Sequence, residues 1–255
     1  MYALPRAGAN ATLCAVAPTV GTRFDVIAFD GDDTLWHNER LFVEAQSQFR
    51  ALLSAFHAPE WIDARLAEAE RRNLPHFGYG IKGFALSMIE TAIDLTEERI
   101  ESRDIRRILD IVRGMLSADV ELLDHAAETV AAVAATHRVM LITKGDLHDQ
   151  ERKVEQSGLG RHFGSVEVVS EKNPATYAGL LRRHGIIAER FLMVGNSLRS
   201  DVLPVLEIGG SAVHIPYELT WDHEVADPPP AGHPGFHSIP GIALLPALLD
   251  GIEAG

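Results

Sequence analysis

The chain has 255 residues, 46% of them hydrophobic and 23% charged, an ordinary composition for a globular protein with one large or two modest domains. Its formal net charge of −13 argues against a nucleic-acid partner, because no general attraction to a phosphate backbone is available. The one cysteine, Cys14, excludes an intramolecular disulfide and suits a reducing cytoplasm. No segment reaches the roughly 18 apolar residues of a membrane span. We therefore expect a cytoplasmic protein with no membrane partner.

Residues 1–23 are predicted to be an N-terminal tail. The stretch 11–20 is mildly apolar, but Pro18 and a poor basic flank make it a weak signal peptide. The first strand follows at once, since Val26, Ile27 and Phe29 form the short apolar run typical of a strand buried on both faces.

Three carboxylates end this strand, namely Asp30, Asp32 and Asp33, with Gly31 between the first two. Carboxylates beside a buried strand are costly unless a cation or a reaction requires them. Gly31 permits a tight turn of the backbone. The alternative is an acidic turn in which Asp32 or Asp33 only caps the helix that follows.

Four amphipathic helices are predicted over residues 37–120. The first stops at Pro59, the second ends near Pro75, the third contains Phe84, and the fourth begins at Thr96 with acidic residues in its first turn. About a hundred residues separate the first strand from the next, whereas a crossover between parallel strands needs about a dozen. The excess predicts a separate all-helical domain inserted after the first strand.

The rest of the chain alternates between helices and strands. After a helix over 121–136, the predicted elements are strand 138–143, helix 147–157, strand 165–169, helix 174–184, strand 191–194, helix 199–207 and strand 212–215. This pattern favours a Rossmann-like α/β fold, a parallel sheet covered by helices on both faces. Residues 24–36 and 121–255 thus form one discontinuous core. It includes an irregular loop over 227–235 and a closing helix over 242–249.

The first motif of the chain resembles a known one. Asp30, Asp32 and Thr34 spell D-x-D-x-T, the nucleophile motif of the haloacid dehalogenase (HAD) superfamily. Thr143 ends the next strand, where that family carries a Ser or Thr, and Lys172 precedes a Pro-initiated helix, where the family places a lysine. The inserted helical domain occupies the place of the family's cap.

The fourth motif departs from the family pattern. Residues 195–201 are similar to the metal motif G-D-x-x-x-x-D, but Asn196 replaces the first aspartate and only Asp201 remains. An amide oxygen can coordinate Mg²⁺ but contributes no full negative charge. Taken singly, the second, third and fourth motifs are weak. All four fall at carboxyl ends of successive strands, the edge at which open α/β sheets bind ligands.

The resemblance implies a role for each matching residue. Asp30 is expected to be the nucleophile, and Asp32 the general acid and then the general base. The expected Mg²⁺ ligands are Asp30, the backbone carbonyl of Asp32, Asn196 and Asp201. The expected phosphate-binding residues are Gly31, Thr143, Lys144 and Lys172, of which Thr143 and Lys172 are also counted as catalytic.

The segment Gly78–Gly83 fits G-x-G-x-x-G but follows a helix, whereas the dinucleotide-binding fingerprint requires a preceding strand. We expect Tyr79 and Lys82 in this segment to reach over the substrate. The alternative is a plain connection between helices.

The predicted function is a Mg²⁺-dependent phosphatase acting on a small phosphorylated metabolite through an aspartyl-phosphate. Asp32 favours this activity over a 2-haloacid dehalogenase, because the dehalogenases of the superfamily lack an acid there. A phosphomutase and a non-catalytic binding protein on the same scaffold remain alternatives. Candidate substrates are phosphoglycolate-like acids, sugar phosphates and nucleoside monophosphates, and the protein is expected to be a monomer or homodimer.

Overall fold

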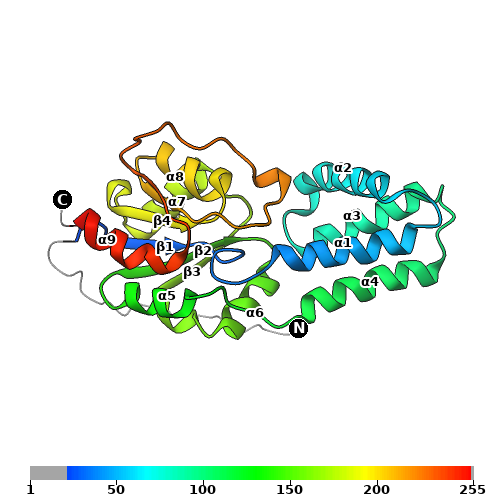
Figure 1. The fold of residues 1–255 in the computed structure, drawn as a ribbon, viewed down its shortest axis with the longest axis horizontal. Coiled ribbons are helices and arrows are strands. Elements are labelled where there is room, and N and C mark those ends of the chain that lie inside the picture. The colour runs from blue at the N-terminus through cyan, green and yellow to red at the C-terminus, as the bar shows by residue number, and fades with distance from the viewer. Residues whose placement is uncertain (1–21, 254–255) are drawn as a thin grey trace, which may run out of the picture.

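The computed structural model describes residues 22–253, so the predicted N-terminal tail lies almost entirely outside the described residues. The chain forms two lobes (Figure 1). One is an α/β domain and the other is a bundle of four helices, joined to it where the first strand ends. This arrangement agrees with the predicted parallel core and its helical insertion.

The α/β lobe is built on a parallel sheet of six strands in the order β3-β2-β1-β4-β5-β6. The strands are β1 (Val26–Phe29), β2 (Arg138–Lys144), β3 (Ser165–Val169), β4 (Phe191–Gly195), β5 (Ser211–His214) and β6 (Phe236–Ser238). The first strand lies at the centre, between β2 and β4, so the acids that follow it stand at the middle of the sheet's carboxyl edge. The edge strand β6 was not predicted, because its three residues follow an irregular loop and carry no periodic pattern.

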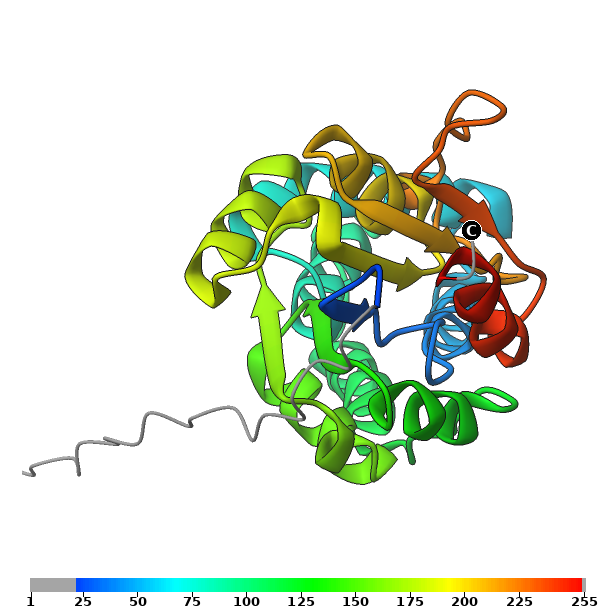
Figure 2. The same cartoon turned by 90° about the vertical axis from the view of Figure 1, so that its left-hand side faces the viewer.

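Helices cover both faces of the sheet (Figure 2). The helices of this lobe are α5 (Ala126–Ala134), α6 (Leu147–Ser157), α7 (Pro174–His184), α8 (Leu203–Glu207) and α9 (Leu245–Glu253). Ile27 and Phe29 pack in a cluster with α5 and α9, whereas Val26 and Ala28 pack with α7 and α8. Successive side chains of a strand point to opposite faces, so this alternation confirms that β1 is buried on both sides.

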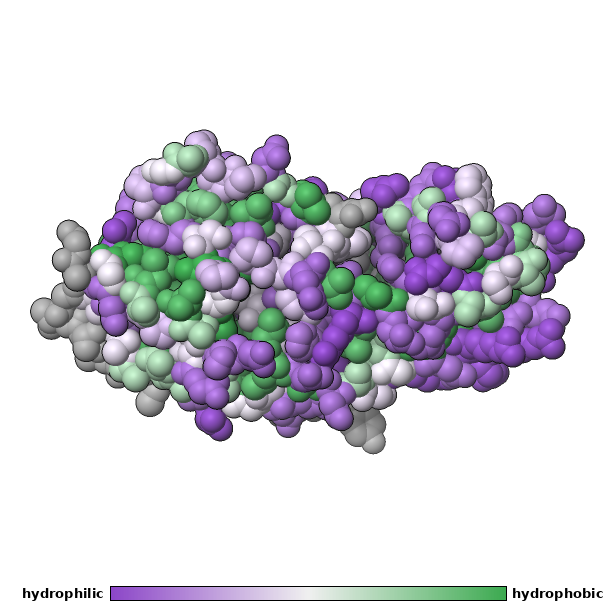
Figure 3. All heavy atoms as spheres, viewed as in Figure 1, coloured by the Kyte–Doolittle hydropathy of each residue, from purple (hydrophilic) through white to green (hydrophobic). Residues whose placement is uncertain are grey.

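The helical lobe has its own hydrophobic core, separate from the two sheet clusters. Its helices are α1 (Glu39–Leu53), α2 (Pro59–Phe77), α3 (Ile81–Leu95) and α4 (Ser102–Ser117). The buried residues of α4 fall on one stripe, including Ile108 and Val112. Hydrophilic side chains cover the outside of this helix (Figure 3).

Several predicted helix boundaries were wrong, and three of them have a clear physical reason. Thr96 ends α3 instead of beginning α4, because Glu97 and Glu98 take positive φ angles of 52° and 62° that break the helix. Pro59 begins α2 rather than only stopping α1, a position where the missing N–H costs nothing. The helix predicted over 121–136 shortens to α5, because the residues before it pair with the segment that leaves β1.

Two connecting segments run side by side between the lobes. Leu35 O accepts the Leu123 N–H, and His37 N–H donates to Glu121 O, at 3.0 and 2.9 Å. The insertion therefore leaves and re-enters the core at one place. None of the helices within residues 22–253 is long and apolar enough to span a membrane.

Candidate active site

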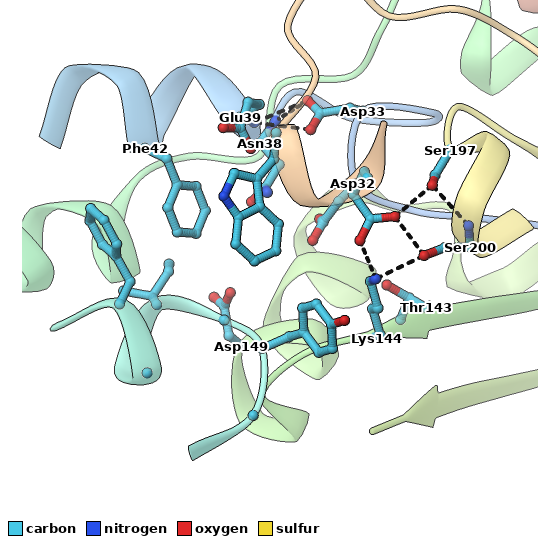
Figure 4. Close-up of a pocket in the computed structure, with 18 of the residues that line it drawn as sticks. Asp32, Asp33, Asn38, Glu39, Phe42, Thr143, Lys144, Asp149, Ser197 and Ser200 are labelled. Carbon is cyan, nitrogen blue, oxygen red and sulfur yellow. Dashed lines mark hydrogen bonds and ion pairs between the residues drawn. The ribbon is translucent and has the colours of Figure 1, made fainter. Parts of the chain in front are cut away.

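The four predicted motifs meet at one cavity. Asp30, Thr143, Lys172 and Asn196 stand at the carboxyl ends of β1 to β4 or in the loops that follow them. They line a cavity of about 160 Å³ whose opposite wall comes from the helical lobe. Residues far apart in the sequence, such as Asp32, Thr143 and Ser197, point into the same space (Figure 4).

Asp30 lies at the centre of this site, 7% exposed. Lys172 Nζ is 2.5 Å from Asp30 Oδ1 and 2.7 Å from Asp201 Oδ1, so one ammonium links the two carboxylates. Burial and the nearby charge of Asp201 raise the pKa of Asp30, and the Lys172 ammonium opposes that rise. The lysine is itself 4% exposed. Lys172 is therefore no solvated surface lysine.

The predicted metal ligands present an all-oxygen set. Thr34 Oγ1 lies 3.3 Å from both Asp30 Oδ2 and Asn196 Oδ1, so these two oxygens face a common region. The Ser197 N–H donates to Asp201 Oδ2 at 3.0 Å and fixes that carboxylate. No cluster of three His, Cys, Asp or Glu with metal-binding geometry occurs in residues 22–253. A metal here would thus depend on two carboxylates, one amide and a backbone carbonyl, a set that suits a hard cation such as Mg²⁺.

Gly195 makes room for one of these carboxylates. A Cβ at this position would lie 2.3 Å from Asp201 Cγ, closer than any real contact. The glycine of the metal motif is thus needed because the strand end and Asp201 approach each other closely.

Asp32 is held by three donors from the core. Trp36 Nε1 and Gln150 Nε2 donate to its carboxylate at 2.6 and 2.9 Å, and Lys153 Nζ lies 2.9 and 3.1 Å from its two oxygens. Lys153 also donates to Asn38 Oδ1 at 2.8 Å. Lys153 could not be predicted from the sequence, because a lysine within helix 147–157 carries no signal that it is buried.

Asp33 and Gly31 have structural tasks. Asp33 Oδ1 accepts the backbone N–H groups of Asn38 and Glu39 at 2.8 and 3.1 Å, so it caps the start of α1, as the capping alternative expected for one of these acids. Gly31 does not line the cavity. A Cβ there would lie 2.5 Å from Trp36 Cζ2, so the position needs glycine for the tryptophan ring rather than for a special turn.

Lys144 lines the cavity beside the carboxylate of Glu224, a residue that was not predicted from the sequence. Its ammonium ion-pairs with Glu224 and lies 2.9 Å from Ser200 Oγ. Ser197 and Ser200 each donate to Glu224 Oε2 at 2.5 Å. Burial acts to raise the pKa of Glu224, but the Lys144 charge and these hydrogen bonds lower it to about 2. Glu224 comes from a short turn in an irregular loop, so no motif marked it.

Tyr79 and Lys82 have different positions. Tyr79 lines the cavity, its ring 3.9 Å from Lys144 Nζ, and its hydroxyl donates to Glu171 at 2.7 Å. Lys82 does not line the cavity and instead ion-pairs with Asp146 at 2.9 Å. The segment Gly78–Gly83 therefore joins the helical lobe to the core through both residues, and of these two side chains only Tyr79 lines the cavity.

Three comparisons relate this chain to known proteins. A family model described as haloacid dehalogenase-like hydrolase matches residues 24–209. A haloacid dehalogenase-like family hydrolase from Xanthomonas campestris is 47% identical, with 93% of this chain and 95% of that one covered and a TM-score of 0.84. None of the curated proteins matches the chain.

Two more distant structures share the fold. The HAD-hydrolase YfnB from Bacillus subtilis, bound to magnesium, is 16% identical over 90% of this chain and all of that one (100%), with a TM-score of 0.64. A 2-haloacid dehalogenase from Pseudomonas syringae is 21% identical over 90% of this chain and 99% of that one, with a TM-score of 0.61. At these identities the likeness concerns the fold alone, so the reaction has to be argued from the site.

Proposed function

The chain belongs to the haloacid dehalogenase-like hydrolases, and on that premise we propose that it is a Mg²⁺-dependent phosphatase acting on a small phosphorylated metabolite. The observation that carries the proposal is the position of Asp32, which lies two residues after Asp30 and lines the same cavity. An alcohol leaving a phosphoester requires a proton, whereas a halide leaves without one. A carboxylate held beside the nucleophile therefore supports phosphoester over haloacid chemistry.

The reaction begins with Asp30. One oxygen of its carboxylate attacks phosphorus, and as the new O–P bond forms, the bond from phosphorus to the leaving oxygen breaks. Asp32, in its protonated form, donates a proton to that oxygen, so the products of the first step are an alcohol and an aspartyl-phosphate. Asp32 is then ionised and takes a proton from water, whose oxygen attacks phosphorus and releases phosphate from Asp30.

The contacts of Asp32 suit this double role. Its carboxylate is 23% exposed and faces the cavity, so a substrate oxygen or a water can reach it. The Lys153 ammonium and the Trp36 indole both donate to this carboxylate, so its position is fixed for both proton transfers. Both donors come from the core, so they hold the carboxylate beside Asp30 independently of the ligand.

Positive charge for the phosphoryl oxygens is available on the core side. Lys172 already touches Asp30, and Lys144 stands at the end of β2 next to Thr143. Thr143 Oγ1 donates to Gln150 at 3.2 Å and lines the same cavity. Lysine ammonium groups and a hydroxyl aimed at the equatorial oxygens stabilise charge that grows in the transition state.

Asp30, the backbone carbonyl of Asp32, Asn196 and Asp201 would hold Mg²⁺. When bound, the cation offsets repulsion between the nucleophilic carboxylate and the phosphoryl oxygens. This ligand set carries two negative charges, on Asp30 and Asp201, one fewer than a set with aspartate in place of Asn196. In the free protein the Lys172 ammonium pairs with both carboxylates and neutralises part of that charge. We expect the measured affinity for Mg²⁺ to be lower than in a homologue with aspartate in place of Asn196.

Turnover of p-nitrophenyl phosphate with Mg²⁺ tests the proposal. The rate should fall to background with EDTA and in Asp30→Asn, and a 2-haloacid panel should release no halide. Turnover that survives both controls would exclude Asp30 as the nucleophile. Halide release without phosphatase activity would favour the dehalogenase. Absence of turnover with a broad phosphoester panel would favour the non-catalytic binding protein, the alternative to which Asn196 points.

The metal ligands are tested separately by Asn196→Asp. The substitution restores a negative charge, so we expect Mg²⁺ binding measured by calorimetry to be unchanged or tighter. A sharply weaker affinity would show that Asn196 is not a ligand.

A further inference from the structure

The wall of the cavity that comes from the helical lobe carries two carboxylates without a partner. Glu39 begins α1 and Glu70 lies in α2, and both line the cavity that holds Asp30 and Asp32. Among the described residues, neither side chain takes part in an ion pair, and neither carboxylate accepts a hydrogen bond. Glu39 stands next to Asn38 and Asp33 at the edge of the pocket (Figure 4).

The positive charge of the cavity is all on the opposite wall. Its lining contains three lysines and neither arginine nor histidine. Lys144, Lys153 and Lys172 belong to the core, and each ion-pairs with a core carboxylate. The lining that α1, α2 and α3 supply contains no cationic residue. A ligand whose phosphate lies against the lysines therefore places its other end against negative charge.

Holding these carboxylates in the wall is costly to the free protein. Burial raises the pKa of both Glu39 and Glu70 to about 7, and the charge of Glu70 adds to the rise at Glu39. A carboxylate removed from water needs a cation or hydrogen-bond donors to offset its lost hydration. The charge of Arg71 offsets only part of the rise at Glu70, and within residues 22–253 no ion pair or hydrogen-bond donor reaches either carboxylate. A bound ligand is therefore the partner that would satisfy them.

Aromatic rings line the same region. The rings of Phe42 and Phe84 meet edge to face with their centroids 5.1 Å apart, and both residues line the cavity. Tyr79 and Trp221 also line the cavity, with their ring centroids 6.0 Å apart. Aromatic faces attract cations, and they do so most strongly where water is excluded. A wall of carboxylates and aromatic rings thus favours an organic cation over a neutral or anionic group.

We propose that the substrate is a phosphomonoester whose alcohol part carries an ammonium group, which binds between Glu39 and Glu70. This inference rests on the proposed phosphatase function and specifies its substrate class, a phosphorylated amino alcohol or amino sugar. The same carboxylates exclude phosphoesters whose alcohol part carries a carboxylate, such as phosphoglycolate, because like charges repel across a poorly hydrated wall.

The test is a set of ligands that differ in charge but little in size. They are 2-aminoethyl phosphate, 2-hydroxyethyl phosphate and phosphoglycolate, with glucosamine 6-phosphate and glucose 6-phosphate as a larger pair. Dissociation constants are measured by calorimetry with Mg²⁺ on Asp30→Asn, which cannot turn the ligands over. We expect the amine of each set to bind at least tenfold more tightly than its neutral counterpart, and phosphoglycolate to bind most weakly.

Two variants assign the preference to the wall. In Glu39→Gln and Glu70→Gln, made in the same Asp30→Asn background, the ratio between amine and neutral ligand should fall to about threefold or less. Glu44→Gln is the matched control, since it removes an exposed carboxylate from α1 outside the cavity and should leave the ratio unchanged. Circular dichroism confirms that each variant is folded.

Equal binding of the amine and neutral members in both sets, or tighter binding of phosphoglycolate, would overturn the inference. A preference that persists in both glutamine variants would do so too. These outcomes are separate from the fate of the phosphatase proposal, which p-nitrophenyl phosphate turnover decides. A preference for amines without turnover of any ester would support the inferred ligand specificity of the wall and contradict the proposed phosphatase activity.

Discussion

Replacing Glu70 by glutamine should stabilise the protein at pH 8 and have little effect at pH 5. Glu70 is partly buried in the cavity wall, and its pKa in the folded protein is raised from 4.5 to about 7. Glutamine keeps the shape of the side chain and carries no charge at any pH. The substitution therefore isolates the free energy of holding a carboxylate at this place.

The sign follows from proton linkage. A group whose pKa is higher in the folded than in the unfolded state contributes stability that is fully present below pH 4.5 and is lost as pH rises through 7. At pH 8 both states are ionised, and a shift from 4.5 to about 7 corresponds to at most about 3 kcal/mol. Residual solvent exposure screens the charge, so we expect about 1–2 kcal/mol.

The assay is thermal unfolding by calorimetry at both pH values. For a protein of this size, about 1–2 kcal/mol corresponds to a rise in Tm of roughly 2–8 °C at pH 8. At pH 5 the folded side chain is protonated, so the two proteins should differ by no more than about 2 °C. The control Glu44→Gln changes an exposed carboxylate and should follow the wild type at both pH values.

Destabilisation of Glu70→Gln at pH 8 would refute this reasoning, because it would mean that the ionised carboxylate has a stabilising partner. A gain of the same size at pH 5 and pH 8 would also refute it, since a packing effect does not follow protonation. The expected result would show that the ionised Glu70 carboxylate destabilises the protein in the absence of a ligand. Such a cost agrees with a role of Glu70 in ligand binding.

Three further substitutions test the site. Gly195→Ala should weaken Mg²⁺ binding measured by calorimetry at least tenfold, because the new Cβ would overlap Asp201; unchanged affinity would exclude Asp201 as a ligand. Lys153→Met should lower kcat at least tenfold and cost about 1–3 kcal/mol in urea unfolding, because it leaves the partly exposed Asp32 without its ammonium donor; kcat close to the wild-type value would remove its positioning role. Asp33→Ala should lose about 1 kcal/mol through uncapping of α1, with kcat changed less than threefold; a loss of activity as large as that of Asp30→Asn would instead assign it chemistry.

The sequence alone determined the class of fold and the region of the site. Alternating helices and strands require a parallel sheet, and the carboxyl ends of parallel strands lie at one edge. Asp30, Thr143 and Lys172 could therefore be placed together from their positions after β1, in β2 and after β3. The excess of chain after the first strand required a separate helical lobe. These conclusions follow from local patterns and chain connectivity, and neither needs atomic contacts.

The tertiary structure decided which partner each charge has. No local pattern shows that Lys153 is buried against Asp32, because a buried lysine and a solvated lysine in this helix would have the same sequence pattern. Glu224 reaches the cavity from an irregular loop, and Lys82 turns away to Asp146. Such pairings join residues that are distant in the chain, so they depend on how the lobes pack.

The cavity wall likewise depends on the tertiary structure and not on any local sequence pattern. Nothing in the sequence sets Glu39 or Glu70 apart from the other polar residues of the helices predicted over 37–120. Folding places them in the wall facing Asp30, away from the cations that would neutralise them. The reacting groups could be read from motifs because a shared reaction requires those residues at fixed places on the sheet. The charge of the substrate-facing wall could not be predicted from motifs, because Glu39 and Glu70 come together in that wall only when α1 and α2 pack over the core.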